Sequence, residues 1–521
     1  MLLALRRFLT GLIVFLLLLG AVVWWGSGMI ISLNGPKIAQ QLEKELGPGF
    51  QVGEISGNIV QGILVTGCTA GPDPATATNT DPIIQAAKCR VVPDWLKLLS
   101  NHLELKQLVF SDVIVDLRRD AKGAVIWPPF IARAAHAQGA SLATTPFGWR
   151  LDRAEVRFHG KSATDKPIVM QIQSAAGDYA PGDHFAIGSC QGDLQNASWS
   201  LNGSVKLNET RALSGTWKLK DAGLWELAQA LTGSNPAGTA VDAGVIPSGL
   251  VTGDLAITGS TSDPEVTGML HWREGAIRHF KVEQGDLDCS WRPGIFTLKD
   301  SVLKAYAGRL AVSGSIDFRR WPGHYDFDTK SEGIELGDFL ADAGYGKLGL
   351  TGKFLGTFTG SGPLTDISSF HGSGHLEAAG GETRNPLADP ALPDMPAVVQ
   401  YQSLVTDLVL GSQTAQLSNT SMVSSDFTLT GAGTVTFAGD LDLTGLLTAP
   451  AKYFAGHPIY GPTIALLNLG DQQVPLDLVV TGTIQAPIVR AQLAGPAGAL
   501  ANPNGLGGFL KKLQGLIGKK E

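Results

Sequence analysis

The sequence predicts a mostly β protein: an N-terminal transmembrane helix, then a long, curled antiparallel β-sheet that forms a groove, with short helices at the ends. Three observations predict this fold. The chain opens with an uncharged apolar run, many later segments alternate between apolar and polar side chains, and 65 of the 521 residues are glycine. The run predicts the anchor, whereas alternation and glycine turns predict many short strands.

The overall composition is that of a folded protein. The chain is 44% hydrophobic and 17% charged, which provides a large core or lining and excludes the disordered class. The net charge of −7 is spread without long runs of one sign, so the basic stripe that phosphate backbones require is missing. Nucleic acid is therefore not an expected partner.

Residues 1–34 are expected to anchor the chain in a membrane. Arg6 and Arg7 precede an uncharged run that begins at Phe8 and is long enough to span a bilayer. Trp24 and Trp25 lie where an aromatic belt would meet the outer interface. A cleaved signal peptide is the alternative, but the run is too long for one and no clear cleavage site follows it. The rest of the chain should then lie on the far side of the membrane.

Residues 35–120 are expected to form an N-terminal module. Two strands broken at Ser56 are followed by a helical turn of the form W-x-x-L-L-S, which starts at Trp95, and by a strand over 103–117. The turn would close one end of the sheet. The stretch from Trp95 to Gly123 resembles the N-terminal module of the AsmA-like and TamB-like family of Gram-negative envelope proteins.

The rest of the body divides into a middle β region with insertions, 121–247, and a more regular β module, 248–495. In the regular module, 427–445 reads FTLTGAGTVTFAGDLDLTG, with apolar residues or glycine at the odd positions. Side chains of a strand point alternately to opposite faces, so the pattern gives one apolar and one polar face. These glycine-turned strands resemble the C-terminal module of AsmA-like proteins.

The resemblance implies a function in phospholipid traffic between the inner and outer membranes. We therefore expect a single-pass inner-membrane protein with its body in the periplasm, which holds lipid acyl chains in an apolar β-groove and contributes to phospholipid transport or outer-membrane lipid homeostasis. Expected partners are phospholipids, the inner membrane, and outer-membrane or other envelope proteins. One alternative is an assembly factor that binds outer-membrane protein strands through its sheet edges. Another is a closed sandwich enzyme.

The residues expected to line the groove share one parity along each strand, so that all of them point to the apolar face. They are Leu310, Val312, Ile316, Phe318, Leu350, Phe354, Phe358, Phe427, Leu429, Val435, Phe437, Leu441, Leu443, Leu478 and Val480. Burial of a lipid tail against such a face is worth about 0.8 kcal/mol per CH₂.

The sequence contains no constellation typical of catalysis. It has no G-x-S-x-G, H-E-x-x-H or Walker motif, so we expect neither an enzyme with catalytic residues nor a cofactor. His371 and His375 would lie about 13 Å apart on a strand, too far for one metal ion, so no metal site is expected there. The alternating Asp286, Asp288, Asp326 and Asp328 are interpreted as solvated, with a calcium site as the alternative.

The four cysteines and the C-terminal tail complete the prediction. Cys68 and Cys89 flank one short insertion and are the first choice for a disulfide, with buried free thiols as the alternative. Residues 496–521 form an amphipathic tail that either lies on an anionic membrane, docks on a partner, or caps the sheet. Its apolar stripe consists of Leu506, Phe509, Leu510, Leu513, Leu516 and Ile517.

Overall fold

The protein is mostly β, as the sequence predicts. The computed structural model describes residues 35–37, 39–40, 43, 49–58, 61–72, 81–94, 105–118, 146–159, 167–194, 197–207, 210–224, 248–261, 263–277, 279–319, 323–364, 367–385, 396–456, 461–466 and 472–494. These residues form 24 strands that belong to one sheet, together with a few short helices.

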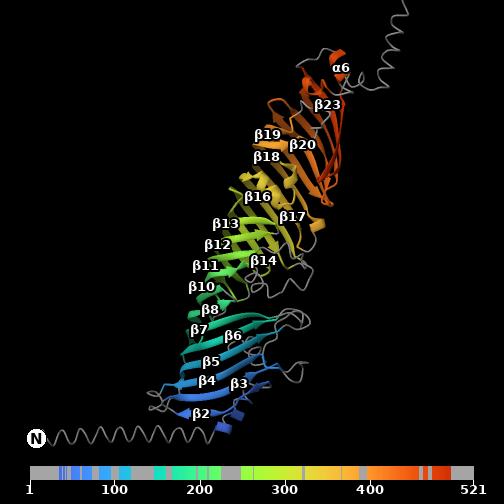
Figure 1. Ribbon diagram of the computed structural model, residues 1–521. Coiled ribbons are helices and arrows are strands. Elements are labelled where there is room, and N and C mark those ends of the chain that lie inside the picture. The colour runs from blue at the N-terminus through green and yellow to red at the C-terminus, as the bar shows by residue number, and fades with distance from the viewer. Residues whose placement is uncertain are drawn as a thin grey trace, which may run out of the picture. The chain divides into compact units, whose positions relative to one another are not determined.

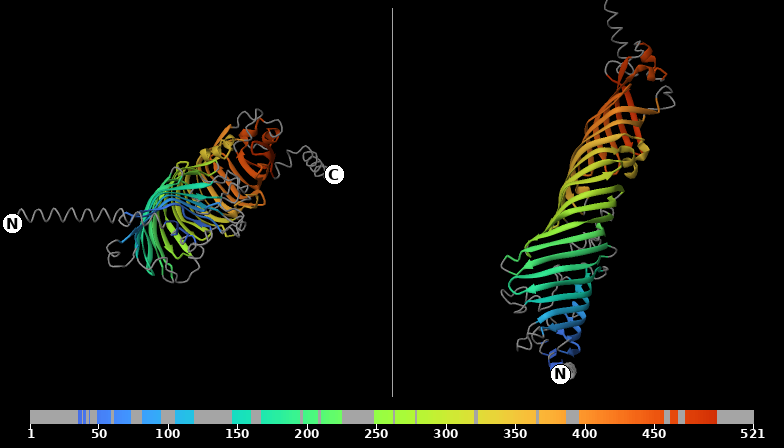
Figure 2. Two further views of the ribbon diagram at one scale, coloured as in Figure 1. Left: turned by 90° about the horizontal axis from the view of Figure 1, so that it is seen from below. Right: turned by 90° about the vertical axis from the view of Figure 1, so that its left-hand side faces the viewer.

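The chain divides into two compact units. One comprises Met1–Val241, Gly249–Leu270 and Ser290–Pro293, and the other comprises Asp242–Ser248, His271–Cys289 and Gly294–Glu521. The two units interleave around residues 242–293, and the boundary predicted between 247 and 248 lies in this stretch. Figure 1 labels the strands, and Figure 2 shows from two further sides that the strands within each unit follow the order of the chain.

The first unit contains ten complete strands and most of an eleventh. They are β1 (Phe50–Gln51), β2 (Ile55–Asn58), β3 (Gly62–Ala70), β4 (Ile84–Pro93), β5 (Leu105–Leu117), β6 (Phe147–Phe158), β7 (Ile168–Ala180), β8 (His184–Leu194), β9 (Ala197–Lys206), β10 (Leu213–Gly223) and β11 (Ser248–Gly259). β12 (Pro264–Ile277) and β13 (Phe280–Arg292) contribute residues to both units.

The second unit contains the remaining strands and several short helices. The strands are β14 (Ile295–Ala305), β15 (Gly308–Asp317), β16 (His324–Glu335), β17 (Lys353–Pro363), β18 (His371–Arg384), β19 (Val398–Gly411), β20 (Thr414–Ser424), β21 (Thr428–Thr436), β22 (Leu441–Pro450), β23 (Gln473–Thr483) and β24 (Ala486–Leu493). The helices are α5 (Leu336–Asp342), η3 (Gly346–Leu348), η4 (Ile367–Ser369), η5 (Ala451–Phe454) and α6 (Gly461–Leu466).

The sheet is mixed, which corrects the expected antiparallel sheet. β14–β24 pair antiparallel with their neighbours in the chain, but β5 and β6 are parallel, with Val113 opposite Ala154. A parallel pair requires a crossover of a dozen or more residues. The long insertion between β5 and β6 supplies it, whereas alternation of side chains carries no information about strand direction.

The sheet is also not strongly curled, in contrast to the curled groove expected from the sequence. Alternation fixes the face on which each side chain lies, but curvature depends on twist and on β-bulges. Bulges do occur here, for example between Leu417 and Thr420 of β20, where Asn419 has a positive φ of 50°.

None of the helices in the described parts of the chain is long and apolar enough to cross a membrane. The predicted anchor, residues 1–34 with Phe8, Trp24 and Trp25, lies outside the described residues, and so do the turn at Trp95 and the amphipathic tail, 496–521. These predictions stay predictions.

Candidate functional site

The second unit has one apolar face that crosses ten consecutive strands. Residues opposite each other in a ladder point to the same face, so the register identifies its members. One row of such partners, from β15 to β24, is Val312, Thr329, Phe358, Gly374, Leu408, Leu417, Gly433, Leu443, Val480 and Val489. We call this the apolar face.

The adjacent row points to the other side and is polar except for Val409. It consists of Ser313, Asp328, Thr359, Ser373, Val409, Gln416, Thr434 and Asp442. Its side chains bond to one another across strands: His375 Nδ1 lies 2.6 Å from Asp407 Oδ1, and the Asn419 amide donates to Asp407 Oδ2 at 2.7 Å. These bonds hold the pKa of Asp407 below its usual value. We call this the polar face.

The register brings together most of the residues predicted to line the groove. Eleven of them lie on strands and point to the apolar face: Leu310, Val312, Ile316, Phe354, Phe358, Leu429, Val435, Leu441, Leu443, Leu478 and Val480. The other four, Phe318, Leu350, Phe427 and Phe437, lie just beyond strand ends.

The two rims at which the strands of this unit end differ in their helices: α5, η3, η5 and α6 lie along one of them, and the short η4 between β17 and β18 lies along the other. Because neighbouring strands are antiparallel, β16 and β22 end at the same rim, where α5 follows β16 and η5 and α6 follow β22. We call it the capped rim. At the opposite rim, short turns at 412–413, 437–440 and 484–485 connect β19 to β20, β21 to β22 and β23 to β24. We call this the turn rim.

At the capped rim, η5 and α6 bury the apolar face. Phe454 of η5 and Ile464 of α6 pack in one core with Phe427, Leu476 and Leu478. Phe427 retains 5% of its exposure and Leu478 retains 8%. These two residues, predicted to line a groove, are therefore core residues with almost no open surface.

α5 covers a second stretch of the same rim. The ring centroid of Phe339 lies 4.9 Å from that of Phe280 and 5.6 Å from that of Phe354. At the end of the helix, Asp342 accepts hydrogen bonds from Lys281 Nζ at 3.1 Å and from the Tyr306 hydroxyl at 2.9 Å. These two bonds lower the pKa of Asp342 and fix α5 against the sheet.

Toward the turn rim the same face becomes open. Along β22, Leu447 is buried, whereas Leu441 and Leu443 are half-buried. The trend is steeper between the two residues that flank β21, from Phe427, which is 5% exposed, to Phe437, which is 42% exposed. The extensive contacts of β14–β24 within the described residues are with neighbouring strands and the short helices. The turn-rim half from β19 to β24 thus carries no helix among the described residues.

Aromatic rings lie down on glycines in this open half. A Cβ on Gly374 would come within 2.7 Å of Phe358 Cδ2, and one on Gly372 within 2.7 Å of Phe358 Cζ, so this ring extends over both glycines. Phe370 covers Gly360 in the same way. Glycine is required at these positions because any side chain would lift the ring off the sheet.

Sequence reasoning missed several members of the apolar face. Tyr325 and Phe327 point to it from β16, where they alternate with Asp326 and stack with Phe370. The period-2 pattern on that strand would have identified them. The first unit also has an apolar row that was not predicted: Cys68, Ala86, Val113, Ala154, Ile172, Gly192, Trp199, Leu219 and Gly253.

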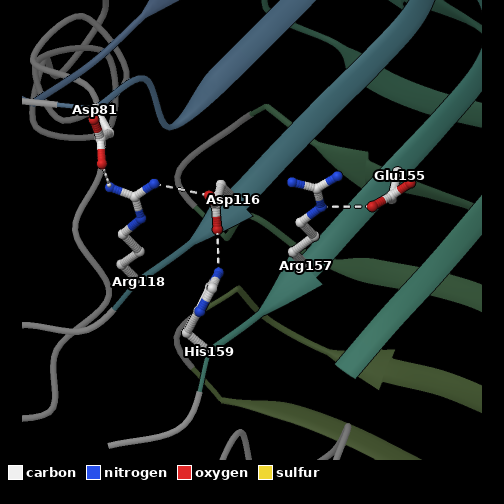
Figure 3. A network of polar contacts seen from close by, with 6 residues as sticks. All are labelled: Asp81, Asp116, Arg118, Glu155, Arg157 and His159. Carbon is white, nitrogen blue, oxygen red and sulfur yellow. Dashed lines mark hydrogen bonds and ion pairs between the residues drawn. The ribbon is translucent and has the colours of Figure 1, made fainter. Parts of the chain in front are cut away.

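A charged network lies at the end of the parallel pair in the first unit (Figure 3). Asp116 of β5 accepts a hydrogen bond from Arg118 Nη2 at 2.8 Å and forms an ion pair with His159, which follows β6. Arg118 also reaches Asp81 at 3.6 Å. Burial alone would raise the pKa of Asp116, but Arg118 and His159 together hold it below its usual value. The network contains no nucleophile. Its role is therefore structural, because it links the ends of β5 and β6.

None of the four cysteines forms a disulfide in this structure. Cys68 lies opposite Ala86, and Cys89 opposite Val65, on the paired strands β3 and β4. Burial raises the pKa of Cys89 to about 12 and that of Cys190 and Cys289 to about 11. The disulfide between Cys68 and Cys89 stays a prediction.

No group of three or more His, Cys, Asp or Glu side chains in the described part of the chain could hold a metal ion. His371 and His375 are both exposed on β18. Comparisons with protein-family models, with curated proteins and with solved structures found no match to this chain. The resemblance to AsmA-like and TamB-like proteins therefore stays a prediction from sequence patterns.

Proposed function

We propose that this protein holds lipid acyl chains against the apolar face of its sheet. The observation that supports this best is the paired apolar row across β15–β24, whose members toward the turn rim are half-buried and not enclosed in the core. The half-buried side chains of this row retain apolar surface that a bound ligand would cover. An acyl chain is a suitable occupant because it needs area and no hydrogen bonds.

The binding free energy of such a complex is additive along the acyl chain. Each CH₂ removed from water contributes about 0.8 kcal/mol, so many weak contacts replace a specific site. Half-buried residues such as Leu443 and Val480 retain the surface for this contact. The proposed site therefore requires neither a cofactor nor a catalytic residue.

The sequence supports a place for this activity in the cell envelope. The predicted anchor at 1–34 would hold the body in the periplasm beside the inner membrane, and the AsmA-like patterns favour phospholipid transport or outer-membrane lipid homeostasis. We propose this location and this role together with lipid binding.

The test is lipid retention by the full chain purified from membranes in mild detergent. Mass spectrometry should detect phospholipid bound to the wild-type protein. The double variant Phe358→Asp/Leu443→Asp places charges on the open half of the apolar face and should lose most of it, at least fivefold. The matched control Thr357→Asp/Thr444→Asp changes the neighbouring residues on the polar face of the same strands and should retain it.

Three results would decide against the proposal: absence of lipid from the wild-type protein, equal loss in both double variants, or loss that follows unfolding in circular dichroism. Photo-crosslinks from β24 to outer-membrane proteins, combined with absence of lipid, would instead favour the assembly-factor hypothesis.

A further inference from the structure

The two rims of the second unit offer different chemistry to an amphiphile. At the capped rim the apolar face ends under protein: Phe339 of α5 packs on Phe354, and Phe454 of η5 lies in the core with Leu476. Phe454 and Leu476 retain 2% and 0% of their exposure. A charged headgroup placed here would have to displace apolar packing and give up water without a partner.

Between β19 and β24 the apolar face ends at the turn rim in polar, solvated turns, whereas between β17 and β18 it ends at η4 and the buried Phe370. Ser412 and Gln413 are exposed between β19 and β20, and both have positive φ. Between β21 and β22, exposed Asp440 bonds Thr436, and Phe437 beside it is 42% exposed. Here an apolar surface and polar groups in contact with water lie side by side.

We infer that a lipid bound to the second unit points its headgroup to the turn rim and its chain ends to the capped rim. This inference rests on the proposed function and adds an orientation to it. One closed, apolar end and one open, polar end match a ligand with a single polar end. A protein partner has no such one-sided requirement, because its polar groups are spread over its surface.

The width of the open half fits this orientation. The open part of β22, Leu441 to Gly445, has five residues, and five residues of a strand span ~17 Å. One leaflet of a bilayer contributes about half of the ~30 Å hydrocarbon core. The chains of a phospholipid thus extend across the open half as far as the covered residues.

The orientation can be tested with two photoreactive phosphatidylethanolamines bound to the full chain. One carries a diazirine at the end of an acyl chain, and the other carries it on the headgroup. Peptide mass spectrometry should map the headgroup probe to the turns at 412–413, 437–440 and 484–485, at least fivefold over the capped rim. The acyl-end probe should instead label the far end of the open half, where it meets the covered residues, near Leu404 and Leu429.

Removal of a cap provides a second arm. Phe339→Ala opens the stretch beside Phe354 and should increase labelling by the acyl-end probe there at least twofold. Leu355→Ala, on the polar face of the same strand, should leave the label pattern unchanged. Equal labelling of both rims by the headgroup probe, or its preference for the capped rim, would overturn the orientation while lipid binding stands. If neither probe labels the apolar face of the wild-type protein, the proposed function itself fails.

Discussion

The capped half and the open half of the apolar face are built from the same strands and the same residue types. Leu447 and Leu476 lie in the core under η5 and α6, whereas Leu443 and Val480, a few residues along the same strands, are half-buried. The difference comes from the connections between strands. At the capped rim, the long connection after β22 folds back over the face. At the turn rim, the tight turns between β19 and β24 leave the face open. Stability should therefore depend on the capped half, and lipid binding on the open half.

The largest effect is expected from Leu476→Ala. Its side chain is fully buried, so the substitution removes apolar contacts and leaves a cavity, at a cost of about 2–5 kcal/mol in the free energy of unfolding. Leu443→Ala, on the open half, should cost about 1 kcal/mol. Urea unfolding followed by circular dichroism measures both. Equal costs would mean that the two halves are packed alike.

The next largest effect is expected from Phe339→Ala, which removes the ring that attaches α5 to Phe280 and Phe354. The ring is half-buried, so we expect about 1–3 kcal/mol, less than for a fully buried phenylalanine. Hydrogen exchange should rise in α5 and at the start of β13 but not in β23. Faster exchange throughout β23 would show that the two caps are not independent.

A smaller, pH-dependent effect is expected at Asp342. Its bonds to Lys281 and Tyr306 lower its pKa, so their contribution is present above the unfolded pKa of about 3.9 and is lost as the pH falls through the lower folded value. The wild-type urea midpoint should fall between pH 6 and pH 3 more than that of Asp342→Asn. Identical falls would exclude Asp342 as an attachment point of α5.

The smallest effect is expected on the polar face. His375 pairs with Asp407 in an exposed position, and exposed ion pairs contribute little to stability. His375→Ala should leave both the urea midpoint and the amount of bound lipid unchanged. A loss of lipid comparable to that of the Phe358→Asp/Leu443→Asp variant would show that the polar face also binds ligand.

Much of the apolar face could be predicted from the sequence because a period of two is a local property. Leu429, Val435, Leu441 and Leu443 were assigned to one face by alternation, and the register confirms that they share it. The same rule also assigns Tyr325 and Phe327 to this face, although only the aspartates beside them were interpreted from the sequence. In β7 and β20, bulges shift the parity within the strand, and alternation fails there.

The sequence by itself determined the mostly β fold and the side of the sheet on which most apolar residues lie. The reason is that successive side chains of a pleated strand point to opposite faces of the sheet. Tertiary structure alone decided three things: the parallel pairing of β5 with β6, the modest curl of the sheet, and the covering of one rim. These depend on contacts between residues far apart in the chain, such as Phe454 with Leu476, which no local pattern encodes. For this reason Phe427 and Phe437, equivalent in the sequence pattern, end as a core residue and an exposed one.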